Sequence, residues 1–198
     1  MWNYDIRLQY PVILTQPNAK IAQVIMSQYG GPDGEMGASL RYLSQRYSMT
    51  NRKVAGLLTD IGTEELAHLE IVASIVRQLT KGLSAKQLEE AGFAPYYIDH
   101  TAAIWPQAAG GIPFNACEFQ SKGDPITDLT EDLAAEQKAR TTYDNILRLV
   151  KDPEVCDPIR FLREREIVHF QRFGEGLRMI QEDLDSKNFY AFNPDFDM

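Results

Sequence analysis

The sequence predicts an all-α protein, a four-helix bundle, from three observations. Apolar residues recur at the spacing of a helix face in four long stretches. A segment of roughly 40 residues, rich in glycine, proline and aromatic residues, separates the second stretch from the third. The chain has 198 residues, of which 44% are hydrophobic, enough for one domain with a substantial core. We therefore expect a single domain over residues 1–198.

The first two helices are expected over residues 18–48 and from Thr50 or Asn51 to residue 81. Asn18 follows a proline and suits the N-cap of the first helix. The run Gly-Gly-Pro-Asp-Gly at 30–34 should bend or break that helix, because proline and glycine both disfavour a helix interior. Residues 1–17 are expected to form an N-terminal arm.

The last two helices are expected from Asp124-Pro125 to residue 151 and from Asp157-Pro158 to residue 184. In both, aspartate suits the N-cap and proline the first helical position. Residues 82–123 would form a crossover with a short helix at 84–91, and residues 185–198 a short C-terminal tail. Two helical hairpins placed side by side need one long crossover, as in ferritin-like bundles. The sequence thus predicts a ferritin-like four-helix bundle.

The charge and composition exclude several classes of function. The net charge is −8 and the sequence pI about 4.9, so a nucleic-acid partner is not expected. No apolar run reaches the length of a membrane helix, and the N-terminus does not resemble a secretory signal. The two cysteines, Cys117 and Cys156, do not form a Cys-x-x-Cys motif. We expect a protein that is neither membrane-bound nor secreted.

Two of the three histidines follow a glutamate by three residues, in Glu65-x-x-His68 and Glu166-x-x-His169. On a helix, residues three apart lie on one face, so each pair can direct two ligands at one point. Both pairs fall on the apolar stripe of their helix. A carboxylate directed into a core is costly unless it is paired or binds a metal. The third histidine, His100, is expected in a loop of the crossover.

Each remaining helix offers one glutamate on its apolar stripe, Glu35 in the first and Glu136 in the third. One Glu, one Glu-x-x-His, one Glu and one Glu-x-x-His, in chain order, form the ligand set of di-iron and di-manganese carboxylate bundles. Carboxylate oxygens with one imidazole per ion suit manganese or iron rather than structural zinc. The sequence therefore predicts a buried dinuclear metal site.

Simpler interpretations apply to individual residues. A lone Glu-x-x-His is most often a surface pair. Tyr42 on pattern alone suits an ordinary core position, and Arg140 suits an ion pair with a buried carboxylate. The acidic residues Asp128, Glu131 and Asp132 are expected on a solvated first turn of the third helix, where they favour the helix dipole.

Five segments of the sequence stand out as a set. They are Leu8-Gln-Tyr-Pro-Val12, Gly30-Gly-Pro-Asp-Gly-Glu-Met36, Asp60-Ile-Gly-Thr-Glu-Glu-Leu-Ala-His68, Ala134-Ala-Glu-Gln-Lys-Ala-Arg140 and Arg165-Glu-Ile-Val-His-Phe170. In these segments the sequence resembles the manganese catalases, in particular a short branch of that family associated with the spore coat. Together the segments span about residues 8 to 170, nearly the whole predicted domain.

The resemblance implies a role for each candidate residue. Glu35 and His68 would serve one manganese ion, Glu136 and His169 the other, and Glu65 would bridge the two. Glu166 would be an acid/base beside the metals rather than a ligand, and Tyr42 would orient the cluster. The implied reaction converts two hydrogen peroxide molecules to oxygen and two waters, in a homo-oligomer that is often a hexamer.

Two alternatives remain open from the sequence. One is a rubrerythrin-like di-iron peroxidase or oxidase on the same scaffold, since iron accepts the same ligands. The other is a structural spore-coat component that keeps the fold and the metals and contacts other coat proteins. The location is accordingly expected to be the cytoplasm or the spore coat.

The sequence departs from longer family members in two places. Its C-terminal tail is short, and it has Ala135 where some members carry a basic residue.

Overall fold

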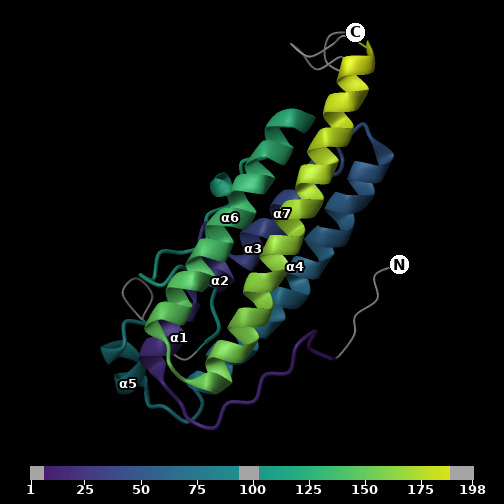
Figure 1. The fold of residues 1–198 in the computed structure, drawn as a ribbon. Helices are drawn as coiled ribbons and strands as arrows, with labels where there is room; N and C mark the ends of the chain where they lie inside the picture. Colours follow the sequence, from purple (N-terminus) through teal and green to yellow (C-terminus); the bar gives the residue numbers. More distant parts are fainter. Residues whose placement is uncertain (1–6, 94–102, 188–198) are drawn as a thin grey trace.

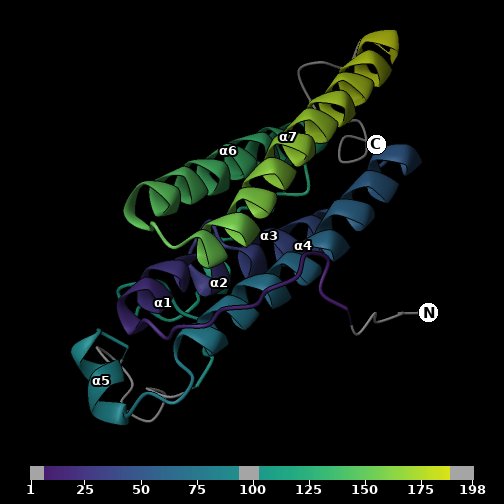
Figure 2. The same ribbon diagram turned by 60° about the horizontal axis from the view of Figure 1, so that its bottom comes forward.

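The computed structural model describes residues 7–93 and 103–187. Two helical hairpins form the bundle (Figures 1 and 2). In one, α3 (Glu35–Gln45) packs against α4 (Arg52–Leu79), and in the other α6 (Pro125–Leu149) packs against α7 (Pro153–Lys187). The two hairpins pack against each other mainly through α4 and α7. The predicted ferritin-like all-α fold is confirmed, and a single bridge between Gln107 and Pro113 is the one β pairing in the described residues.

The first expected helix is three helices, α1 (Ala19–Ile25), α2 (Ser27–Gly30) and α3. The predicted break at 30–34 is therefore confirmed, and it places Glu35 at the start of α3. Glycine is required at position 30, because a Cβ there would collide with the backbone of Pro106 and Gln107. The break thus lets the crossover approach the bundle directly beside the first candidate ligand.

Side-chain caps begin the next helices where the sequence predicts them. The Asn51 side chain accepts the N–H groups of Lys53 and Val54 at the start of α4. Asp124 accepts from Thr127 N at the start of α6. In the crossover, α5 (Ala85–Glu90) follows a capping box at Ser84, and a 3-10 helix, η2, covers Ala116–Glu118. His100 lies outside the described residues.

The expected start of the fourth helix at Asp157-Pro158 is wrong. Helix α7 begins at Pro153, where Asp152 accepts the N–H of Glu154 at 3.0 Å, so an Asp-Pro signal of the same kind acts five residues earlier. Pro158 lies inside the helix and removes one backbone hydrogen bond there. Burial of Val155, Cys156 and Ile159 in the core favours the helix despite this loss. Of the expected tail, residues 185–187 continue α7 and residues 188–198 lie outside the described part.

The core consists of two apolar clusters, one toward each end of the bundle. Along α4, Val54, Leu58 and Ile61 belong to one cluster and Ile71 to Leu79 to the other. Along α7, Phe173 and Ile180 belong to the first cluster and Val155 to Leu162 to the second. Both Glu-x-x-His pairs lie between the clusters, so the candidate site is enclosed along the bundle axis by apolar packing.

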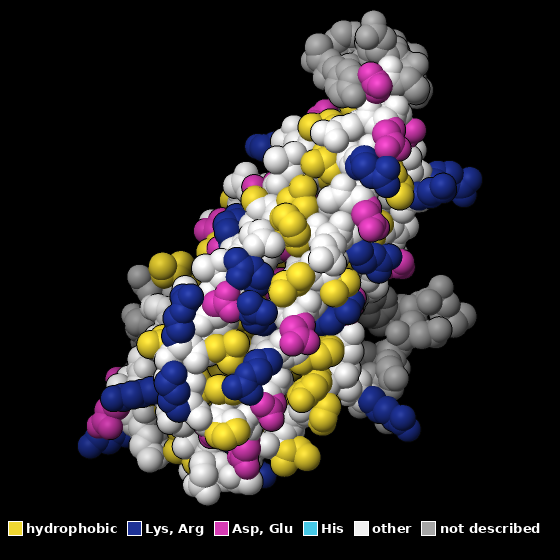
Figure 3. All heavy atoms as spheres, in the orientation of Figure 1, with side chains coloured by type: hydrophobic (Ala, Val, Ile, Leu, Met, Phe, Trp, Pro, Cys, Tyr) yellow, Lys and Arg dark blue, Asp and Glu magenta, His cyan; other side chains and the backbone are white. Residues whose placement is uncertain are grey.

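The N-terminal arm runs along α4 as an extended segment (Figure 2). Gln78 anchors it, accepting from Leu14 N and donating to Val12 O, both at 2.9 Å. The surface over α6 and α7 mixes acidic, basic and apolar side chains (Figure 3). Within the described residues, the structure contains no helix that is both long and apolar enough to cross a membrane.

Candidate metal centre

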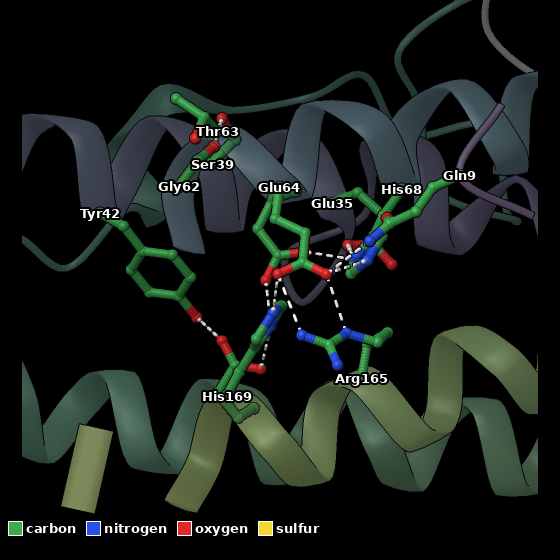
Figure 4. Close-up of polar contacts among 12 residues, drawn as sticks. Gln9, Glu35, Ser39, Tyr42, Gly62, Thr63, Glu64, His68, Arg165 and His169 are labelled. Carbon is green, nitrogen blue, oxygen red and sulfur yellow. Dashed lines mark hydrogen bonds and ion pairs between the residues drawn. The ribbon is translucent and has the colours of Figure 1, made fainter. Parts of the chain in front are cut away.

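All six predicted metal-site residues lie together and are buried. Glu35 comes from α3, Glu65 and His68 from α4, Glu136 from α6, and Glu166 and His169 from α7, and none is more than 2% exposed. Figure 4 shows His68 and His169 approaching each other from opposite sides of the bundle. Their rings are nearly parallel, with centroids 5.5 Å apart. The arrangement brings one imidazole from each hairpin to a common centre.

The two oxygens of Glu65 divide between the two histidines. Its Oε2 lies 2.6 Å from His68 Nδ1, and its Oε1 lies 2.8 Å from His169 Nδ1. A second carboxylate completes each side, since Glu35 Oε2 is 3.7 Å from His68 Nδ1 and Glu136 Oε2 is 3.5 Å from His169 Nδ1. The structure thus contains two adjacent sets of two carboxylate oxygens and one imidazole nitrogen, with Glu65 common to both.

The ion-paired atoms of this cluster fit bound cations. Glu65 Oε1 and Glu136 Oε2 lie 2.8 and 3.5 Å from His169 Nδ1 as ion pairs, but none of these three buried atoms makes a well-directed hydrogen bond. A buried polar group that lacks a good hydrogen bond is costly, so three at one point leave lone pairs that a cation could use. Their lone pairs suit a divalent metal, which prefers carboxylate and imidazole ligands when it is manganese or iron.

The charge at the centre leads to the same interpretation. Burial, and then the charge of Glu65, raise the pKa of Glu35 to about 7. Burial, followed by the charges of Glu136, Glu35 and Glu65, raises the pKa of Glu166 well above its usual value. Burial would also raise the pKa of Glu65, but the two histidines lower it overall. Two divalent cations would balance the charge of four ionised glutamates, so the donor set fits a pair of ions.

Two tyrosines brace the outer glutamates in a reciprocal pattern. Tyr42 of α3 donates to Glu136 of α6, and Tyr143 of α6 donates to Glu35 of α3. Tyr42 therefore contacts the centre in addition to packing against Phe173. Tyr143 is not among the site residues predicted from the sequence. The signal was present, since Glu35 and Tyr42 are seven residues apart and so are Glu136 and Tyr143.

Glu64 is the second residue that the sequence pattern missed. Its carboxylate lies on the far side of both histidines, 3.0 Å from His169 Nε2 and 3.5 Å from His68 Nε2 (Figure 4). Arg165 donates to both of its oxygens, at 2.8 and 3.1 Å, and Gln9 of the arm donates at 2.7 Å. Burial raises the pKa of Glu64, but these hydrogen bonds lower it far more. One ionised carboxylate therefore faces both imidazoles away from the centre.

Glu166 completes the cluster at its α7 side. Ligand atoms of Glu65, His68, Glu166 and His169 all lie within 4.8 Å of one another. The Oε1 atom of Glu166 is buried and has no hydrogen-bond partner in the described chain. This position is compatible with a metal ligand and with a proton-transferring group beside the metals.

The expectations for the charged residues are met only in part. Arg140 forms the expected ion pair, with Asp144 at 2.7 Å, but this carboxylate is partly exposed rather than buried. Asp128 and Asp132 are 1% and 0% exposed, although a solvated first turn was expected for them. Both lie on the same face of α6 as Glu136, eight and four residues before it, and that face is turned into the bundle.

The family model for manganese containing catalase matches residues 1–190. This chain belongs to that family. It is 50% identical to Protein CotJC of Bacillus subtilis (strain 168), over 96% of this chain and 100% of the relative. It is 31% identical to a probable manganese catalase of Clostridium acetobutylicum, over 90% of this chain and 79% of the relative.

The fold agrees with this membership. The crystal structure of KatB, a manganese catalase from Anabaena PCC7120, superposes with a TM-score of 0.80 at 28% sequence identity. The match covers 98% of this chain and 83% of that one. The predicted resemblance to the manganese catalases, with a ferritin-like bundle, is confirmed.

Proposed function

We propose that this chain is a catalase that converts two hydrogen peroxide molecules to oxygen and two waters at a pair of manganese ions. The observation that carries the proposal is the division of the Glu65 carboxylate between the Nδ1 atoms of His68 and His169. Membership of the manganese catalase family supports the choice of metal and substrate. A pair of such ions, when bound, would supply the acceptor and donor for two electrons.

The protein residues would hold the ions and control protons. Glu35 and His68 would bind one ion, Glu136 and His169 the other, and Glu65 both. The hydroxyls of Tyr42 and Tyr143 would fix one oxygen of each outer glutamate, leaving the other oxygen for the metal. The apolar clusters on either side exclude bulk water along the bundle. Glu166, with a free buried Oε1, would accept and return the peroxide proton.

Metal content and oxygen yield test the proposal together. The protein would be produced with both manganese and iron available, and its ions counted by elemental analysis. We expect two manganese ions per chain and one oxygen molecule for every two peroxides consumed. A protein that consumes peroxide only with an added reductant, without releasing oxygen, would instead be the di-iron peroxidase alternative.

The role of Glu166 is tested by Glu166→Gln, with Glu65→Gln as the matched control. An amide replaces a carboxylate in hydrogen bonding but is a poor ligand for a hard cation. If Glu166 transfers protons, its variant keeps both ions and loses about 10²–10⁴-fold in oxygen evolution. The Glu65 variant should lose metal. Loss of metal from both variants would instead make Glu166 a ligand, and full turnover in Glu166→Gln would exclude a catalytic role.

A structural role in the spore coat is the second candidate, and the 50% identity to Protein CotJC favours it. In that case the protein would form a homo-oligomer in the coat and contact other coat proteins. Location by immunogold labelling of spores separates coat from cytoplasm. A chain found in the coat that binds two ions but evolves no oxygen would support this candidate over the catalase.

A further inference from the structure

A row of buried carboxylates leads along α6 to the candidate metal centre. Asp128, Asp132 and Glu136 are four residues apart, so they lie on one face of the helix. At a rise of about 1.5 Å per residue, the row spans about 12 Å. Its outer end lies at the loop before α6, where Lys122 is exposed. The row therefore connects the edge of the bundle with a predicted metal ligand.

The outer carboxylate is satisfied by backbone groups. Asp128 accepts the N–H of Lys122 at 2.7 Å and that of Gly123 at 2.9 Å. Arg41, 2% exposed, holds the same part of the crossover by donating to the carbonyl of Phe119. These contacts close the bundle over the outer end of the row and order the loop there.

The middle of the row is not satisfied. Both carboxylate oxygens of Asp132 are buried without a hydrogen-bond partner in the described chain, and so are both polar atoms of the Gln45 amide on α3. Both side chains are 0% exposed. Burial raises the pKa of Asp132 well above its usual value, while the nearby Gln45 amide and Arg41 lower it. Four orphaned polar atoms from two facing helices therefore lie in one buried region.

Water is the occupant that such a region requires. Leaving each atom unsatisfied costs about 1–3 kcal/mol. A buried water makes about three hydrogen bonds to otherwise unsatisfied groups, and the carboxylate and amide offer both acceptors and donors. A third polar group lies on the same face of α3, because Tyr42 is three residues before Gln45 and both side chains are fully buried. The Tyr42 hydroxyl donates to Glu136 and keeps an acceptor lone pair.

We propose that Asp132 and Gln45 hold buried water between Asp128 and Tyr42, and that this hydrated row carries protons between the candidate metal centre and the loop at residues 121–123. The proton-carrying part rests on the proposed catalase function. Oxidation of one peroxide to oxygen releases two protons and two electrons. Reduction of the next peroxide to two waters consumes two protons and two electrons. A hydrogen-bonded row of hydroxyl, water and carboxylate lets the centre exchange these protons with solvent without admitting peroxide.

The water is tested first, by a crystal structure of the wild-type protein at a resolution that shows ordered water. We expect a water within hydrogen-bonding distance of both Asp132 and Gln45. A direct hydrogen bond between the two side chains, with no water beside them, would overturn the proposal. This result does not depend on turnover, so it stands even if the protein evolves no oxygen and the proposed function fails.

The path is tested by comparing Asp132→Leu with Asp132→Asn. Leucine removes the water ligands, whereas asparagine keeps them at nearly the same shape. We expect the leucine variant to retain its metal, to lose about 10-fold or more in oxygen evolution and to show a larger solvent deuterium isotope effect. The asparagine variant should recover most of the wild-type rate. Glu131→Leu, on the neighbouring, partly exposed position of α6, is the matched control.

Two results would refute the path. The first is that Asp132→Leu, with its metal bound, evolves oxygen at the wild-type rate and with the wild-type isotope effect. The second is that Asp132→Leu and Glu131→Leu lose the same share of the oxygen-evolution rate. If leucine at position 132 prevents folding, Gln45→Leu removes the facing amide from α3 instead. The same slower rate and larger isotope effect are expected there, and a wild-type rate would again refute the path.

Discussion

Replacement of Glu64 by glutamine should weaken both metal sites at once. The Glu64 carboxylate lies 3.0 Å from His169 Nε2 and 3.5 Å from His68 Nε2, on the side of each ring away from the centre. Arg165 holds both of its oxygens in place. A carboxylate behind a metal-bound histidine fixes the ring and raises its basicity as a ligand. Since one carboxylate faces both rings, a single substitution would act on both proposed ions.

The expected size follows from the geometry. Loss of such a partner typically lowers metal affinity about 10–100-fold, or roughly 1.4–2.7 kcal/mol. The glutamine amide has one accepting oxygen, and its nitrogen would oppose the second imidazole N–H. We therefore expect the larger loss at one ion and a smaller loss at the other. The larger change should occur at the ion whose imidazole faces the amide nitrogen.

The assay is a competition titration of the metal-free protein with manganese(II) and a chelator of known affinity. Both binding constants are fitted for the wild type and for Glu64→Gln. Asp60→Asn is the control, one turn earlier on α4, where the carboxylate is 71% exposed and 3.9 Å from Arg172. Unchanged affinity at both sites in Glu64→Gln would refute the argument. An equal loss in Asp60→Asn would show that general surface charge, not the histidine contact, controls binding.

Three further predictions follow from the same centre. His68→Ala or His169→Ala should bind well below two ions per chain, because each is the one imidazole on its side of the centre among the described residues; full occupancy by elemental analysis would contradict this. Tyr143→Phe should lower manganese affinity, because the freed Glu35 oxygen loses its hydrogen bond, and an unchanged titration would argue against a bracing role. Burial and the Glu65 charge raise the pKa of Glu35 to about 7. The folded metal-free protein therefore binds this proton more tightly than the unfolded chain does, and it loses stability as the pH rises and the proton leaves. The Tm of the metal-free protein should fall as the pH rises from about 6 to about 8, and manganese should reverse the loss; a rising Tm would contradict this.

The sequence by itself determined the architecture and most of the centre. Helical spacing of apolar residues and a long crossover are local and compositional signals, and they sufficed for a four-helix bundle. The ligand candidates followed because each glutamate or histidine interrupts an apolar stripe, as in Glu65-x-x-His68. Helix geometry alone then directs these side chains inward.

Tertiary structure decided the contacts between helices far apart in the chain. The hydrogen bond between Tyr143 and Glu35 joins residues 108 positions apart, and spacing along one helix cannot reveal it. Glu64 and Glu65 are neighbours of the same type, and only the approach of α7 decides that Glu65 lies between the histidines and Glu64 behind them. Asp132 is buried on the face of α6 that meets Gln45 and Arg41 of α3. In each case the neighbouring helix, not the local sequence, determines which polar atoms lose water and which partners replace it.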